Sequence, residues 1–215
     1  MNNMQQFLEQ NAEAIENYDF MDDSEKAGFE NKFQAFARAN KAEIGTFLPE
    51  AEFYDDLIPV IYNSFYNDRE WEDFFVSEVE TMIRIFIQDP EKDEDGVDNF
   101  SKLESMGLSK LTEGPFGKKL LSLLIKQIDH SDPYISHKFL ALVANYWISS
   151  LPDASAIDKL KSKLSDSNWQ IRWLAHAGLT SPVIREHTGD INIPFSDKVK
   201  YFLRNYFGDP NKPKR

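Results

Sequence analysis

Apolar residues recur at spacings of three and four along almost the whole chain, and this periodicity constrains the fold more than any other feature. The two clearest stripes are Trp71, Phe75, Val79, Met82, Ile83, Phe86 and Phe116, Leu120, Leu123, Leu124, Ile128. Such spacing places the apolar side chains on one face of an α-helix. The run 83–87 alternates as a strand would, but it continues a helical stripe. We therefore predict an all-α fold with about ten or eleven helices.

Capping residues and prolines predict where this pattern starts and stops. Asp22 and Glu25 have the spacing of a helix capping box. Pro59 is expected to kink or split the helix that contains it. Residues 89–98 are predicted to form an exposed loop, and residues 180–195 to be irregular, because neither segment shows helical spacing.

Two helix pairs in the second half of the chain match each other at a period of 36 residues. Aligning Ile135 with Ile171 also aligns Leu124 with Leu160, Ile128 with Leu164, Ala141 with Ala177 and Val143 with Leu179. The second copy resembles the turn and second helix of a HEAT repeat, on the residues Asp166, Ile171, Arg172, Ala175, Ala177 and Leu179. The first copy is a weaker match, with Ser136 where that family usually has arginine. The resemblance covers about residues 116–179.

The resemblance implies an α-solenoid, in which stacked antiparallel helix pairs present an extended surface. HEAT-like proteins mostly bind other macromolecules, and a minority act on DNA through a basic concave face. In this family a pair such as Asp166 and Arg172 usually tightens the stack, so a structural role is expected for both residues. Residues 1–98 show helices but no repeat in register with these, and they are either diverged repeats or a helical cap.

The length of the chain suits one domain, and its charge is unevenly divided. We expect a single helical domain over residues 1–208, followed by a loose tail at 209–215. The first 100 residues hold 25 Asp and Glu against 7 Lys and Arg, a net charge of −18, whereas the remainder carries +6. We therefore distinguish an acidic half, 1–98, from a HEAT-like half, 99–208. Either the acids only solvate exposed helix faces, or they attract a basic partner.

Aromatic and acidic residues mix between residues 54 and 72, which makes this segment the candidate site for a partner. The candidates are Tyr54, Asp55, Asp56, Tyr62, Tyr66, Glu70, Trp71 and Glu72. Aromatic side chains ringed by acids suit a surface that binds a basic protein. The alternative is that these aromatic residues complete the core or a seam between helices.

The sequence offers no recognisable pattern for catalysis or for a cofactor. The absence of cysteine excludes a thiolate nucleophile and cysteine-ligated metals. No serine-hydrolase elbow, phosphate-binding loop or zinc-protease motif occurs. Residues 91–102 resemble an EF-hand loop, but Lys102 stands where such a loop needs a bidentate acid. His137 and His176 could share a face of successive repeats, yet no further ligand is apparent, so we predict neither a cofactor nor a metal.

These features favour a non-enzymatic protein-binding module. Its most concrete version is a small cytoplasmic inhibitor or immunity protein that neutralises a basic partner, such as a nuclease toxin. One alternative is a generic adaptor or scaffold. Another is nucleic-acid binding through the basic residues of the second half, namely Lys118, Lys119, Lys126, Lys159, Lys161, Lys163, Arg172, Lys198, Lys200 and Arg204. The net charge of −12 opposes binding to nucleic acids and to anionic membranes, and no apolar run is long enough to span a bilayer.

Overall fold

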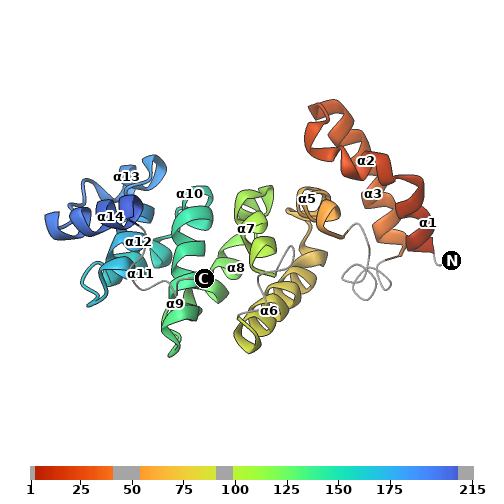
Figure 1. Ribbon diagram of the computed structural model, residues 1–215. Coiled ribbons are helices and arrows are strands. Elements are labelled where there is room, and N and C mark those ends of the chain that lie inside the picture. Colours follow the sequence, from red (N-terminus) through yellow and green to blue (C-terminus); the bar gives the residue numbers. More distant parts are fainter. Residues whose placement is uncertain (1–2, 41–53, 91–98, 208–215) are drawn as a thin grey trace. The chain divides into compact units, whose positions relative to one another are not determined.

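The computed structural model describes residues 3–40, 54–90 and 99–207, and no strand occurs among them (Figure 1). If the continuous helical run 133–150 is counted once, this part of the chain contains 12 α-helices. The prediction of an all-α fold is therefore confirmed, and the number of helices is close to the expected one. Residues 91–98 of the predicted loop, and the tail at 209–215, lie outside the described residues.

The chain forms two compact units, Met1–Leu120 and Leu121–Arg215. Their boundary falls inside helix α8 (Gly117–Gln127), so the charge boundary expected at residue 98 lies within the first unit. The first unit holds 27 Asp and Glu against 11 Lys and Arg, whereas the second holds 9 against 13. The two units therefore differ in sign, with net charges of −16 and +4.

The first unit is built around a continuous chain of aromatic rings. Its helices are α1 (Asn3–Gln10), α2 (Ala12–Glu16), α3 (Asp23–Ala39), α5 (Tyr54–Phe65), α6 (Glu72–Gln88) and α7 (Asn99–Leu108), with the 3-10 turns η1 (Tyr18–Phe20), η3 (Arg69–Trp71) and η4 (Lys110–Glu113). Helix α5 contacts α2, α3 and α7, and α6 packs on α7. The ring centroids lie 3.9–6.1 Å from one neighbour to the next, in the order Phe7, Phe33, Phe65, Trp71, Phe74, Phe75 and Phe116. Burial of these rings is the main apolar contribution that holds α1, α3, α5 and α6 together.

Local signals explain the start of α3 and the continuity of α5. The Asp22 carboxylate accepts hydrogen bonds from the backbone N–H groups of Ser24 and Glu25, and Glu25 accepts one from the Asp22 N–H, so the capping box is confirmed. Helix α5 runs through Pro59 without being split. A proline removes only one helical hydrogen bond directly, and Leu57 and Val60, both fully buried, hold the helix to the core on either side of it.

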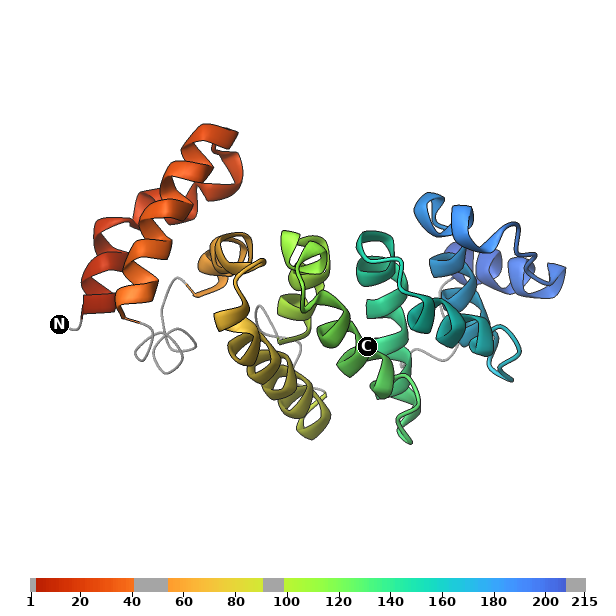
Figure 2. The same cartoon turned by 180° about the vertical axis from the view of Figure 1, so that it is seen from behind.

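The second unit contains the repeated helix pairs. Helix α9 (Pro133–Leu142) continues through the π-helical segment η5 (Val143–Trp147) into α10 (Ile148–Ser150), and α11 (Ala154–Lys163), α12 (Trp169–Leu179), α13 (Pro182–Thr188) and α14 (Phe195–Phe207) follow. Helices α11 and α12 lie side by side in both views (Figures 1 and 2), and α12 also contacts α9 and η5. Helix α12 therefore lies at the centre of this unit.

The 36-residue period reappears in the helix boundaries. Shifted by 36, α8 and α9 coincide with α11 and α12 to within one residue at each end. The caps coincide as well: the side chain of Asp132 accepts from the Tyr134 N–H at 2.8 Å, and that of Asn168 accepts from the Gln170 N–H at 2.9 Å. The 36-residue period of the apolar residues therefore also applies to the positions where these helices begin, end and are capped.

Helix α13 corrects the expectation that residues 180–195 are irregular. It begins with Pro182 in its first turn, after Ser181, and ends at Gly189, whose φ is +70°. A proline at the start and a glycine at the end are the usual boundaries of a helix. At seven residues, α13 is too short to show a full apolar stripe, and only Ile184 is fully buried.

Gly178 is expected to be required where α12 packs against η5. A Cβ atom at this position would lie 2.9 Å from the Cβ atom and 3.0 Å from the Cα atom of Ala144, and the second of these is backbone that cannot turn away. Overpacking of this kind costs about 1–3 kcal/mol, which outweighs the gain of about 1 kcal/mol in helix propensity. We expect Gly178→Ala to lower the free energy of unfolding by about 1 kcal/mol in urea denaturation.

Gly28 provides the matched control within α3. A Cβ atom there meets nothing within 4 Å, so Gly28→Ala should gain the propensity alone and raise the stability by up to about 1 kcal/mol. Stabilisation by both substitutions would show that α12 and η5 are not in close contact.

Candidate functional site

The aromatic candidates Tyr62 and Trp71 lie in the core of the first unit. Trp71 is 1% exposed, and its ring stacks on Phe65 with centroids 3.9 Å apart and an angle of 17° between the planes. Tyr62 is 3% exposed and meets the ring of Phe75 edge to face. The expectation that these two side chains contact a partner is therefore wrong. They instead complete the core, which was the alternative interpretation. Trp71 lies in η3 directly before α6, and Phe75 and Val79 continue the same buried face along α6.

The remaining candidates do not form one aromatic and acidic surface. The side chains of Tyr54, Asp55 and Asp56 lie outside those that the structure describes. Glu70 is exposed in η3. Glu72 accepts a hydrogen bond from the Lys119 ammonium group at 2.6 Å, and this bond raises the pKa of Lys119.

Tyr66 lines a polar hollow of about 460 Å³ between α3 and the end of α5. Four of its lining residues are paired across the hollow: the Gln34 amide donates to the Ser64 carbonyl at 2.9 Å, and Arg38 forms an ion pair with Asp68 at 3.2 Å. At the same wall, the Tyr18 hydroxyl binds Glu30, and burial raises the pKa of Tyr18, with the bond to Glu30 as the second cause. We interpret this hollow as a structural junction, because several of its polar groups bond to one another, although the buried Ser64 hydroxyl has no hydrogen-bond partner among the described residues.

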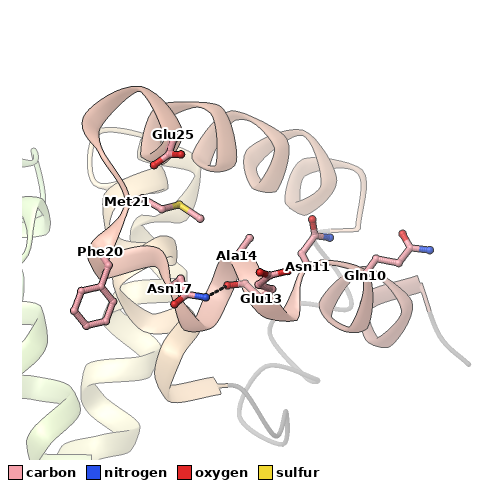
Figure 3. A pocket seen from close by; sticks show the side chains of 8 residues that line it. All are labelled: Gln10, Asn11, Glu13, Ala14, Asn17, Phe20, Met21 and Glu25. Atoms are coloured by element: carbon pink, nitrogen blue, oxygen red, sulfur yellow. Dashed lines mark hydrogen bonds between the residues drawn. The ribbon is translucent and has the colours of Figure 1, made fainter.

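A second hollow, of about 530 Å³, lies between α2, η1 and the start of α3, and we call it the acidic hollow (Figure 3). Its lining combines two carboxylates, three amides and three apolar side chains: Glu13, Glu25, Gln10, Asn11, Asn17, Ala14, Phe20 and Met21. In Figure 3, Met21 extends between α2 and α3, while the ring of Phe20 lies at the outer end. Phe20 is 88% exposed, the largest exposed fraction among the exposed large apolar side chains described.

Local hydrogen bonds fix the shape of the acidic hollow. The Asn17 amide donates to the Glu13 carbonyl at 2.9 Å, which closes the end of α2. The Asn11 amide donates to the Phe7 carbonyl at 2.6 Å, and its oxygen accepts from the Lys32 ammonium at 2.5 Å. The capping box of α3 holds Glu25 at the opposite wall. Phe20 is exposed because it lies in a 3-10 turn between two helices, where no apolar face continues.

The surroundings of the acidic hollow carry an excess of negative charge. Residues 3–40 contain eight Asp and Glu against three Lys and Arg. Lys26 donates to the Asp19 carbonyl and Arg38 to Asp68, whereas the Lys32 ammonium donates to Asn11 of the lining. Within the described residues, no cation forms an ion pair with Glu13, Glu16, Asp22, Asp23 or Glu25. The hollow therefore presents acid and one bare aromatic ring together.

Several basic residues of the second half are occupied by carboxylates. Lys159 and Lys163 both pair with Asp129, and these two bonds lower the pKa of Asp129. Lys119 pairs with Glu72, and Arg172 pairs with Asp197. These pairings reduce the number of cations available for phosphate contacts, which counts against the nucleic-acid alternative.

The carboxylate that pairs with Arg172 is that of Asp197 and not that of Asp166. The guanidinium group donates to both Asp197 oxygens, at 2.7 and 2.6 Å, and the Asp197 side chain is fully buried. Arg172 also donates to the Asp166 and Ser167 carbonyls at 2.7 and 3.0 Å. Asp166 thus contributes its backbone, while its carboxylate accepts from the Asn168 N–H. Sequence reasoning missed Asp197, whose only signal is an acid in the first turn of the last helix.

Groups of metal-ligating side chains are absent from the part of the chain that the structure describes. Burial lowers the pKa of both His137 and His176, and the His176 ring also binds the Ile191 carbonyl at 2.7 Å. Most of the EF-hand-like segment, residues 91–98, lies outside the described residues.

Comparisons with protein-family models, with curated proteins and with solved structures give no match. None of the described helices is both long enough and apolar enough to cross a membrane.

Proposed function

We propose that this chain is a non-enzymatic protein-binding module that binds a basic partner through the acidic hollow. The observation that carries the proposal is Phe20, an 88% exposed ring beside the carboxylates Glu13 and Glu25 in a segment with eight acids and three cations. A lysine or arginine side chain suits this lining, because the carboxylates attract its charge and the ring face attracts it as well.

The concrete form we favour is a cytoplasmic inhibitor or immunity protein whose partner is a basic toxin such as a nuclease. Acid presented where a nuclease binds phosphate would both attract the partner and block its substrate. The resemblance of residues 116–179 to HEAT repeats also supports a binding role, since such folds present broad surfaces. An adaptor that recognises a basic segment is the alternative with the same chemistry.

A photo-crosslinking amino acid placed at position 20 tests this proposal directly. Phe20 is exposed, so the substitution leaves the fold intact, and crosslinking in the native cell followed by mass spectrometry identifies what touches the ring. We expect a protein whose crosslinked segment is rich in lysine and arginine. A crosslink to nucleic acid or to an acidic segment, or no crosslink at all, would contradict the proposal.

The acidic side chains are expected to affect the rate constant of association with the partner, and the Phe20 ring the rate constant of dissociation. Glu13→Lys with Glu16→Lys should slow association by about tenfold or more at low salt, and this difference should shrink as salt is added. Phe20→Ala should instead speed dissociation, because an interfacial aromatic ring contributes mainly after contact. Surface plasmon resonance separates the two effects.

The matched control changes the same charge in the second unit. Asp158 and Glu186 are both exposed, and Asp158→Lys with Glu186→Lys alters the net charge by the same amount. If this control slows association as strongly as the changes at Glu13 and Glu16, the partner responds to net charge and not to the acidic hollow.

A further inference from the structure

Helix α14 exposes its apolar face to solvent. Its opposite face packs on α12 through Asp197 and Tyr201. Phe195, Val199 and Phe202 follow one another at spacings of four and three, so they lie on one side of the helix, with Leu203 beside them. Their exposed fractions are 80%, 38%, 55% and 46%, in the order Phe195, Val199, Phe202 and Leu203. Helices that end a folded unit normally show a polar outer face.

Two contacts fix the orientation of α14. Asp197 forms the buried ion pair with Arg172 of α12, and the ring of Tyr201, four residues later, stacks on Trp173 with centroids 3.9 Å apart. Both partners belong to α12. Because these contacts use the opposite side of α14, the apolar face is directed away from α12.

Lysines border the apolar face on both edges. Lys198 lies three residues after Phe195 and four before Phe202, and Lys200 lies three before Leu203, so each is adjacent to the apolar row. Both lysines are exposed. Residues 198–207 of α14 contain three Lys and Arg and no Asp or Glu, although the whole chain carries −12. At physiological ionic strength charges more than about 8 Å away are largely screened, so this local charge decides what the face attracts.

We infer that α14 is a membrane-surface helix that binds anionic lipid headgroups. Aromatic and aliphatic side chains on one face, bordered by lysines, are the arrangement of helices that lie in the plane of a bilayer interface. Pairing of two copies through this face is disfavoured, because it would bring Lys198 and Lys200 of both copies together. The inference departs from the expectation that the net charge of −12 opposes binding to anionic membranes, because that expectation considered the whole chain and not the charge around one helix. It is independent of the proposed function, which concerns the first unit.

Co-sedimentation of the full chain with vesicles tests the inference. We expect binding to vesicles of phosphatidylcholine with about one third phosphatidylserine, and little binding to phosphatidylcholine alone. Phe195→Ser with Phe202→Ser should reduce partitioning about tenfold or more, because two apolar side chains no longer enter the interface. Lys198→Glu with Lys200→Glu should reduce it at least as much, since each lysine near an anionic surface contributes about fivefold.

Matched controls lie elsewhere in the second unit. Val183→Ser removes an apolar side chain that is 44% exposed on α13, and Lys161→Glu reverses an exposed charge on α11. Both variants should bind anionic vesicles like the wild type. Circular dichroism and thermal melting of every variant separate lost binding from lost folding.

Three results would overturn the inference: no binding of the wild type to anionic vesicles, equal binding to neutral vesicles, or binding that survives the double phenylalanine substitution. The first of these would leave the α14 face to a protein partner. None of the three affects crosslinking at position 20, so the two proposals fail separately.

Discussion

Replacing Trp71 with alanine is expected to lower the free energy of unfolding by about 4 kcal/mol. The indole is 1% exposed and connects the rings of Phe65 and Phe74 in the aromatic chain of the first unit. Its removal leaves a large cavity in the junction between α5 and α6, where helices on both sides are already packed. Urea denaturation followed by circular dichroism measures the loss.

Phe20→Ala is the control, because it also removes an aromatic ring from the first unit. With 88% of its surface exposed, Phe20 contributes little to the core, so its removal should change stability by less than about 0.5 kcal/mol. Trp71→Phe should retain most of the stability, since a ring still fills the site. If Trp71→Ala melts like the wild type and only loses a partner, then Trp71 is a contact residue and our assignment of it to the core fails.

The helices were predictable because each carries its own signals. The capping box of Asp22 and Glu25, and the stripe from Phe75 to Phe86, lie within single helices and depend on neighbours three or four residues away. Helix α13 was missed because its seven residues hold only one fully buried side chain. Its boundaries, Pro182 and Gly189, were the remaining signals, and they indicate a helix only when read together.

The candidate site was much less predictable than the helices. The acids around Trp71 in the sequence suggested that it lies on a partner-binding surface. Its helical spacing with Phe75 and Val79, however, already indicated that it lies on a buried face. Phe20 gave no periodic signal, because it lies in a 3-10 turn. Its importance depends on which rings the fold leaves bare, and that depends on contacts between helices far apart in sequence. The acidic character of the first unit, in contrast, could be read directly from the residue counts.

The partner of Arg172 shows the same limit in a single contact. Asp166 is six residues away and was the natural expectation, whereas Asp197 is 25 residues away, on a different helix. A guanidinium group can satisfy a backbone turn and a carboxylate at once, because its five N–H groups point in different directions. The local half of this arrangement could be predicted, and the long-range half could not.

Arg172→Ala is expected to lower the free energy of unfolding by about 3 kcal/mol, because it leaves a fully buried carboxylate without its cation. Arg185 is the matched control in the same unit. It forms an ion pair with Asp190 at 2.5 Å, but the two side chains are 61% and 78% exposed, so Arg185→Ala should cost less than about 1 kcal/mol. Equal effects of the two substitutions would show that the Arg172 pair is not buried. Asp197→Asn should restore part of the stability in the Arg172→Ala background, since the unpaired charge is then gone.

The same pair predicts how stability responds to acid. The hydrogen bond from Arg172 holds the pKa of Asp197 below its ordinary value. A carboxyl group with a lowered pKa in the folded state stabilises the fold fully above the ordinary value of about 4, and this contribution is lost as the pH falls below it. The stability of the wild type should therefore decrease between about pH 4 and the lower pKa of Asp197, and the stability of Arg172→Ala should decrease less over the same range.

Comparing the two proteins removes the contribution of Asp129, whose pKa is also lowered but whose bonds to Lys159 and Lys163 remain in both. Parallel pH profiles would mean that Asp197 titrates independently of Arg172, and the assignment of this ion pair would then be wrong.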